Sequence, residues 1–297
     1  MKKGYSSAQN FRTALLERIK KMASNDGKTV QRLQRQVAYD RLLCRLFSGD
    51  TVPWILKGGH VMELRIHNSR ATKDIDLALK DMKIFNAKTQ DKQNKAILAR
   101  LQEKAALNLK DFFEYIISEP VLDLDAAPDG GARFPVEAQI DGKTFSKFHL
   151  DVGVGDVWIE PHDKIKLNDW LSFAGIDSIA IPVISKEEHF AEKLHAYTLP
   201  RDGTFNSRVK DLVDLVLLVQ EKGMKTKLLM TALDETFTRR KTHKLPLDLI
   251  PPPKEWETPF SVMAEECHIE LSICESFGLV EKYFKKIHIA IKSGASR

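Results

Sequence analysis

Apolar residues recur at helical spacing through the first part of the chain. A first stripe runs from Phe11 to Met22 and a second from Val30 to Leu46, and the turn-forming sequence Asn25-Asp26-Gly27 separates them. Residues three and four apart share one face of a helix. The pattern therefore predicts two amphipathic helices over residues 8–48.

The next apolar segment is much shorter. Val52 to Leu56 is a brief apolar run of the kind found in buried strands, and Lys57-Gly58-Gly59 ends it. Residues 60–67 return to helical spacing. A strand, two glycines and a helix are predicted to follow one another directly.

Strict alternation of polar and apolar residues follows at Asp74 to Leu79. Successive side chains of a strand point to opposite faces, so Asp74 and Asp76 share one face of a half-buried strand. Residues 93–117 are predicted to be helical, and the stretch 123–133, rich in Asp, Gly and Pro, is predicted to be a loop.

The next two strands are predicted at 134–140 and 144–154. Asp141-Gly142 lies between them, and this dipeptide favours the tight turn of a β-hairpin.

The character of the chain changes at Ser185. Ser185 and Glu188 form a capping-box pattern ahead of a helix, and a further helix is predicted over 207–221 with Gly223 as its stop. The remainder is predicted to be mostly helical, interrupted by Pro251-Pro252-Pro253.

These elements predict an α/β (α+β) protein with a small mixed sheet and a helical C-terminal part. We expect an N-terminal helical extension at 1–50, a core at 51–184 and a helical C-terminal lobe at 185–297.

Composition agrees with a globular protein. Of the 297 residues, 43% are hydrophobic and 29% are charged, which is ordinary for a folded domain with a real core. The N-terminus has no continuous apolar stretch, which argues against a secretory signal or a membrane span. The three cysteines form no CxxC pair, so neither a disulfide framework nor a zinc site is predicted. We expect a cytoplasmic protein.

Basic residues are unevenly placed although the net charge is only +5. They gather in the first fifty residues and again between Arg239 and Lys244. Such clusters suit a polyanion such as RNA. The alternative is a solvated helix face, and charge alone favours that reading.

Asp74 and Asp76 are the chief candidates for chemistry. Two carboxylates on one strand face suit Mg²⁺, which takes an octahedral shell of oxygen ligands. The preceding Gly58 and Gly59 leave backbone N–H groups at a helix start able to face a phosphate. An Asp-x-Asp pair alone is more often a solvent-facing part of a strand, so the upstream glycines matter.

The segment from Lys57 to Leu77 resembles the first motif of the abortive-infection AbiEii/AbiGii-type nucleotidyltransferase toxins. The matching stretches are Lys57-Gly58-Gly59, Leu64-Arg65 and Arg70 to Leu77. These toxins belong to the polymerase-β-like superfamily, which the MenT-type toxins also resemble. The sequence departs from the usual Gly-Ser or Gly-Thr by having His60 after Gly59. By resemblance, Lys57, Gly58, Gly59 and Thr72 are predicted to bind the nucleotide.

A third carboxylate completes the metal site in this superfamily. Asp151 lies on a predicted strand and points away from Leu150 and Val152, so the resemblance assigns it this role. Asp156, in the turn that follows, is the competing candidate.

The helical part continues the resemblance with a lysine on one helix and an Arg-x-x-Asp-x-x-Asp segment on the next. Lys193 suits a point-charge contact to a triphosphate. Arg208 and Asp211 lie three residues apart and are predicted to pair. The family match places Lys193, Arg208 and Asp211 in the site, with Asp214 as a helper. The alternative is that they form ordinary helix ion pairs.

The resemblance implies a metal-dependent enzyme that uses Mg²⁺ or Mn²⁺ and transfers a nucleoside monophosphate from an NTP, with release of pyrophosphate. It further implies a toxin–antitoxin system, an RNA acceptor such as tRNA, and a cognate antitoxin protein. The alternatives are a small-molecule nucleotidyltransferase of the antibiotic-modifying kind and a degenerate nucleotide-binding scaffold.

Overall fold

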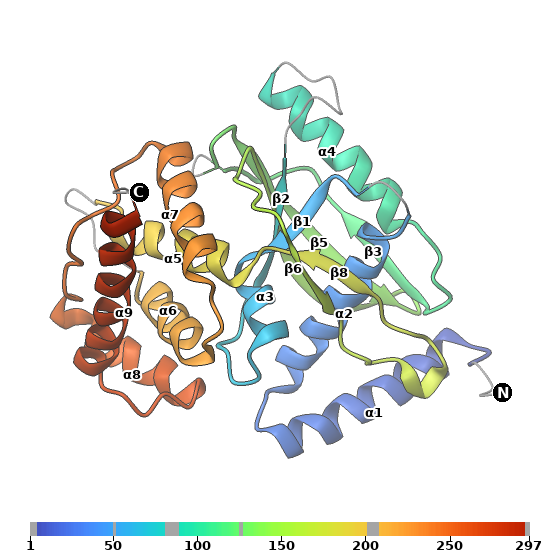
Figure 1. Cartoon of the computed structure of the whole chain (residues 1–297). Coiled ribbons are helices and arrows are strands. Elements are labelled where there is room, and N and C mark those ends of the chain that lie inside the picture. The colour runs from blue at the N-terminus through green and yellow to red at the C-terminus, as the bar shows by residue number, and fades with distance from the viewer. Residues whose placement is uncertain (1–4, 50–51, 81–88, 125–126, 201–207, 295–297) are drawn as a thin grey trace. The chain divides into compact units, whose positions relative to one another are not determined.

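The chain forms two compact units in the computed structural model, which describes residues 5–49, 52–80, 89–124, 127–200 and 208–294 (Figure 1). Unit 1 comprises Met1–His60, Ala71–Gly155 and Lys164–Val183. Unit 2 comprises Val61–Arg70, Asp156–Asp163 and Ile184–Arg297. The predicted boundary at residue 50 lies outside the described residues, and the three-part division of the chain remains a prediction.

The two predicted N-terminal helices are confirmed as α1 (Ala8–Asp26) and α2 (Val30–Leu46). The side chains of Ser7 and Thr29 cap their first turns by accepting hydrogen bonds from backbone N–H groups. Gly27 ends α1 in the left-handed conformation, as the turn signal predicted.

A mixed sheet dominates unit 1. Its strand order in the described residues is β3-β5-β6-β2-β1-β8-β7, with β4 paired to β5 at the side. The strands are β1 (Trp54–Lys57), β2 (Asp74–Leu79), β3 (Phe113–Ile117), β4 (Leu122–Asp123), β5 (Gly131–Ile140), β6 (Lys143–Val154), β7 (Asp163–Lys166) and β8 (Ala180–Val183). β2 runs antiparallel to β1 and parallel to β6, so the predicted mixed α/β class is confirmed.

Helix α3 (Gly58–Arg65) begins directly after β1 and contains both glycines, so it starts two residues before the predicted helix at 60–67. The Asp141-Gly142 turn is also confirmed. Both residues have positive φ angles, 59° and 62°, which are those of the two-residue hairpin turn that joins β5 and β6.

One face of the sheet is covered by α2 and by α4 (Gln90–Ala105). Tyr39 of α2 packs edge-on against Phe148 of β6, with ring centroids 4.7 Å apart. Because side chains alternate along a strand, His149 and Asp151 point to the opposite face. The core of unit 1 therefore lies on the helix side, and the polar residues of β6 lie on the other.

The predicted helix over 93–117 is wrong in its last part. Helix α4 ends at Ala105, and Phe113–Ile117 forms β3, which pairs antiparallel with β5. Lys110 and Phe112 have left-handed backbones that no helix can continue through. Between them, the buried Asp111 binds two arginines of α2, Arg41 and Arg45. The predicted loop at 123–133 likewise contains the end of β4 and the start of β5.

Unit 2 is helical after Ile184 in the described residues, as predicted. Its helices are α5 (Lys186–Thr198), α6 (Val209–Glu221), α7 (Thr226–Arg240), α8 (Glu257–Glu266) and α9 (Ile273–Gly294). The side chain of Ser185 accepts a hydrogen bond from the backbone of Glu188, which confirms the predicted cap of α5. The three prolines at 251–253 separate α7 from α8.

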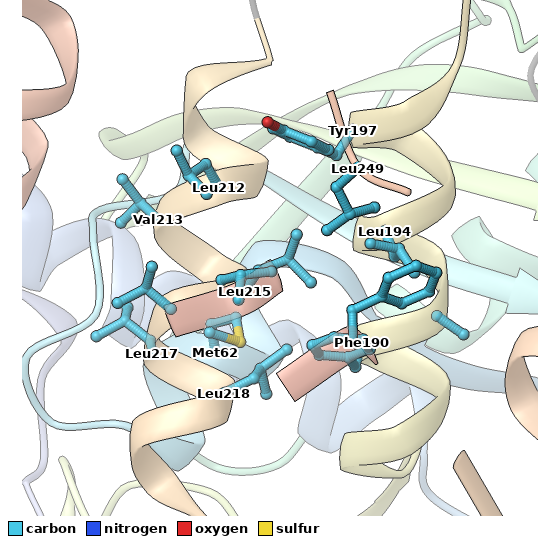
Figure 2. Packing of buried hydrophobic residues seen from close by; sticks show 14 of the residues in the cluster. Met62, Phe190, Leu194, Tyr197, Leu212, Val213, Leu215, Leu217, Leu218 and Leu249 are labelled. Atoms are coloured by element: carbon cyan, nitrogen blue, oxygen red, sulfur yellow. The ribbon is translucent and has the colours of Figure 1, made fainter. Parts of the chain in front are cut away.

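The core of unit 2 is built from buried side chains of α5, α6, α7, α8 and α9, and Figure 2 shows part of it. Figure 2 shows Phe190 and Leu194 of α5 facing Leu215 and Leu218 of α6. Trp256 is 1% exposed and packs edge-on against Tyr197, which places it in the core. All three cysteines are free. None of the helices in the described part of the chain is long and apolar enough to cross a membrane.

Candidate active site

The pairing of β2 with β6 brings the three predicted metal-binding carboxylates together. In this parallel ladder Asp76 is the register partner of Asp151, and Asp74 is the partner of His149. Register partners point to the same side of a sheet, so the carboxylates form one face, which we call the carboxylate face. His149 Nδ1 lies 3.3 Å from Asp74 Oδ1 at its edge.

Arg133 of β5 also lies on the carboxylate face. Its Nε and Nη2 donate to the two carboxylate oxygens of Asp151 at 2.8 and 2.7 Å, and Nη2 lies 3.5 Å from Asp74 Oδ2. The hydrogen bonds to Asp151 raise the pKa of Arg133, so the guanidinium is a permanent positive charge. No motif or spacing in the sequence marked this residue.

The oxygen donors of the carboxylate face have the chemistry that a divalent metal ion requires. Carboxylate oxygens on adjacent strands are the ligands that Mg²⁺ and Mn²⁺ prefer. A cationic nitrogen already lies within 3.5 Å of oxygens from both Asp74 and Asp151, which marks a position favourable to positive charge. Within the described residues, no three His, Cys, Asp or Glu side chains are arranged as a ready metal-binding group.

The two glycines are required by the close approach of side chains from β2 and the loop before it. A Cβ on Gly58, whose φ is +70°, would lie 1.9 Å from Asp76 Oδ2. A Cβ on Gly59 would lie 2.6 Å from the hydroxyl of Thr72. The glycines were predicted to give the backbone access to a triphosphate, and these close contacts are a second reason for glycine at both positions. Only glycine lets Asp76 and Thr72 pack against the start of α3.

His60, which follows Gly59 in place of the serine or threonine expected from the resemblance, is directed into the core. Its ring is fully buried, and Nε2 lies 3.0 Å from Asp40 Oδ1 of α2. Trp170 and Asn168 donate to the other oxygen of Asp40. His60 is thus a structural residue. Lys57, by contrast, is the register partner of Asp76 at the end of β1.

The predicted residues of the helical part meet in unit 2. Lys193 Nζ lies 2.8 Å from Asp214 Oδ2 and 3.3 Å from Asp211 Oδ1. Arg208 Nη1 lies 3.6 Å from Asp211 Oδ2, which agrees with the predicted ion pair. Arg70, which belongs to the first motif but has no predicted role, forms two hydrogen bonds to Asp214 at 2.9 and 2.8 Å.

Asp214 is the carboxylate that Lys193 and Arg70 share. Its side chain is completely buried, and burial alone would raise its pKa, but Lys193 and Arg70 together hold that pKa below its usual value. Burial likewise opposes the charge of Lys193, and Asp214 and Asp211 outweigh it and raise the pKa of the lysine. Lys193 and Asp214 therefore stay charged inside unit 2 because opposite charges lie beside them.

Asp156 and Asp151 have different partners. Asp156 belongs to unit 2, where Arg240 donates to it at 3.0 Å and to Glu192 at 3.2 Å. Asp151 is the one that neighbours Asp76. Of the two candidates for the third carboxylate, the strand pairing favours Asp151.

A separate hollow contains none of these residues. It has a volume of about 830 Å³ in unit 1 and is lined by aromatic side chains that include Tyr5, Phe11 and Phe112. Size alone would select it as a ligand site, but it holds no pair of carboxylates. The carboxylate face therefore remains the candidate active site.

Comparison with protein families finds one match that covers most of the chain. Residues 41–271 match the family described as nucleotidyl transferase AbiEii toxin of type IV toxin–antitoxin systems. No curated protein sequence matches.

Solved structures also match the chain. The nucleotidyltransferase toxin MenT4 of Mycobacterium tuberculosis has 14% identity and a TM-score of 0.56, over 93% of this chain and 98% of that one. JHP933 of Helicobacter pylori has 14% identity and a TM-score of 0.46, over 90% of this chain and 96% of that one. At such identities the likeness to MenT4 concerns the fold alone.

Proposed function

Because the chain belongs to the AbiEii nucleotidyltransferase toxin family, whose members act in type IV toxin–antitoxin systems, we propose that it is a metal-dependent enzyme that transfers a nucleoside monophosphate to RNA. The observation that carries this proposal is the carboxylate face, where Asp74, Asp76 and Asp151 lie on adjacent strands. An antitoxin partner and an NTP substrate follow from the family.

In this proposal Asp74, Asp76 and Asp151 hold Mg²⁺ or Mn²⁺. The metal would neutralise charge on the triphosphate and on the leaving pyrophosphate. Asp151 would also take the proton of the acceptor hydroxyl, since a carboxylate can act as a general base. The protein itself supplies position and fixed charge, which account for most of the rate in phosphoryl chemistry.

The nucleotide-binding roles are proposed residue by residue. In unit 1, the backbone at Gly58 and Gly59 offers N–H groups to a phosphate, with Lys57 and Thr72 beside them. In unit 2, Lys193, Arg208 and Asp211 keep the roles that the family resemblance assigns. The side chain of Lys193 is 12% exposed, and its Nζ already pairs with Asp211 and Asp214.

An RNA acceptor is favoured over a small molecule by the basic surface at the end of α7. Arg239, Lys241 and Lys244 are exposed there, and a hollow of about 330 Å³ is lined by Lys241, His243 and Lys244. Together, the exposed residues Arg239, Lys241 and Lys244 are called the α7 basic surface below. Arg240 is excluded because it binds Asp156 and Glu192.

The N-terminal basic cluster contributes less than its sequence suggests. Arg41 and Arg45 are buried and bind Asp111, and Arg18 lies over the ring of Phe173 at 4.3 Å. Those charges stabilise unit 1. The α7 basic surface is therefore the better part of the chain with which to test RNA binding.

The transfer reaction is tested with labelled nucleotides. With tRNA, Mg²⁺ and each NTP in turn, label at the α-phosphate is expected to enter the RNA, whereas label at the γ-phosphate leaves in pyrophosphate. Gel electrophoresis of the RNA measures whether either label has entered it. Transfer of γ-label would show a kinase, and label in an added small alcohol or aminoglycoside but not in RNA would support the small-molecule reading. Absence of transfer with every NTP and acceptor would support the scaffold.

Reversal of the α7 basic surface tests the acceptor. The triple change of Arg239, Lys241 and Lys244 to Glu is expected to weaken tRNA binding and to flatten its salt dependence. The slope on a log–log plot should fall by about 0.7 for each single-strand phosphate that the protein no longer neutralises. NTP binding is expected to persist. Fluorescence anisotropy at several salt concentrations measures this.

A matched control reverses Lys92, Lys95 and Lys143, three exposed lysines of unit 1, to Glu. This variant has the same net charge as the first. Equal loss of tRNA affinity in both variants would mean that only net charge matters, and the α7 basic surface would lose its assignment.

A further inference from the structure

Arg133 is bound by two of the three carboxylates that are proposed to hold the metal. Its forked contact to Asp151 uses both oxygens of that side chain, and the same Nη2 reaches towards Asp74. The side chain of Arg133 is 30% exposed and that of Asp151 is 12% exposed. The pair is therefore partly shielded from water and is accessible from one side.

A β-bulge places Arg133 there. The register of β5 with β6 shifts between Ala138 and Gln139, and beyond the shift Arg133 is opposite Asp151. Without the bulge, the count from the hairpin turn would set Arg133 opposite Leu150, whose side chain points to the core face. A slip of one residue turns a strand's side chains to the other face, so the bulge is what puts this positive charge on the carboxylate face.

The charges on this face need a cation. Three carboxylates on adjacent strands repel one another, and a positive group between them relieves the repulsion. The guanidinium does so with a single charge and fixed planar geometry. A divalent metal does so with two charges and short oxygen contacts. Both cannot take the same lone pairs of Asp151 and Asp74.

We propose that Arg133 is an internal cation of the carboxylate face, which holds Asp151 and Asp74 when no metal is bound and yields them when a divalent metal binds. This inference rests on the proposed metal site. Arg133 is then a positioning residue that lowers metal affinity and keeps the carboxylates in place before the metal arrives.

The opposite role for Arg133 would be to orient Asp151 towards the metal while remaining bound to it. A carboxylate offers about four lone-pair positions, so a bidentate arginine leaves some of them unused. The two roles predict opposite changes in metal affinity when the guanidinium is removed. Metal affinity is therefore the discriminating measurement.

The experiment is a Mn²⁺ titration of the full chain without nucleotide, with free Mn²⁺ measured by electron paramagnetic resonance. In Arg133→Gln we expect Mn²⁺ to bind about tenfold more tightly than in the wild type, because a competing charge is gone. Arg133→Lys keeps the charge but loses the fork, and a smaller tightening is expected. If Arg133→Gln folds poorly, Arg133→Lys is titrated in its place.

Thermal unfolding gives a second readout. Arg133→Gln is expected to melt lower than the wild type without metal and to gain more from saturating Mn²⁺, since metal that binds the native state stabilises it. Lys147→Gln is the matched control. It removes a positive charge from β6, where Lys147 pairs with Glu137 at 3.0 Å rather than with the carboxylate face. Its Mn²⁺ affinity is expected to equal that of the wild type.

Asp76→Asn separates the inference from the metal site on which it rests. Loss of Mn²⁺ binding in Asp76→Asn, together with tighter binding in Arg133→Gln, supports both. Loss in Asp76→Asn with unchanged or weaker binding in Arg133→Gln overturns the role of Arg133 and leaves the metal site standing. Mn²⁺ binding that does not depend on Asp76 in either background overturns both.

Discussion

Asp76→Asn is expected to reduce nucleotide transfer by at least about a thousandfold while the protein stays folded, because loss of a metal ligand removes several kcal/mol of transition-state stabilisation. The change keeps the size of the side chain, which matters because Asp76 packs against the start of α3 at Gly58. Asp76 is half-buried rather than part of the core, so unfolding should be little affected. Transfer of α-label and thermal melting are measured on the same preparation.

The control for this variant is Asp141→Asn. Asp141 lies in the exposed hairpin turn, where asparagine adopts the same left-handed backbone, and it belongs to the same unit as Asp76. Its activity is expected to equal that of the wild type. Retention of more than about a tenth of wild-type transfer in Asp76→Asn would show that no essential metal depends on this carboxylate, since a tenfold effect is worth only about 1.4 kcal/mol.

Asp214→Ala is expected to destabilise unit 2 by about 3–5 kcal/mol, because it leaves two buried positive charges without their shared partner. Those charges are Lys193 and Arg70, both bound to Asp214 within 2.9 Å. Urea unfolding, followed by circular dichroism, measures the effect.

The direction of the pKa shift of Asp214 decides the pH at which urea unfolding should be measured. The pKa of Asp214 in the folded protein lies below its usual value of 3.8, so its stabilising effect is complete above that value and is lost only as the pH falls further. Neutral pH therefore reports the whole effect. Asp91→Ala is the control, since Asp91 pairs with Lys95 on the exposed surface of α4. If Asp214→Ala and Asp91→Ala move the urea midpoint equally, the cluster of Lys193, Arg70 and Asp214 is not what holds unit 2 together.

The sequence by itself determined the elements whose signals are local. The alternation from Asp74 to Leu79 specifies a strand with two aspartates on one face, and the Asp141-Gly142 turn specifies the hairpin. Ser185 marks the start of α5 through its own hydrogen bond. Each of these signals acts over two to four residues and needs no distant partner.

The segment 113–117 shows where a local signal was overridden. It was predicted to continue a helix, yet it is β3, because Asp111 just before it is held by Arg41 and Arg45 of α2. Arg45 and Asp111 are 66 residues apart in sequence. No propensity within the segment indicates that anchor, and tertiary contacts outweigh propensity when they conflict.

Only the tertiary structure decided which charges meet. The basic clusters looked alike in sequence, but Arg240 is taken up by Asp156 and Glu192, whereas its neighbour Lys241 is exposed. Arg70 meets Asp214 across 144 residues of sequence, and Arg133 meets Asp151 because one bulge shifts the register. Ion pairing depends on which side chains the fold brings within hydrogen-bonding distance, and neither spacing nor composition encodes that distance.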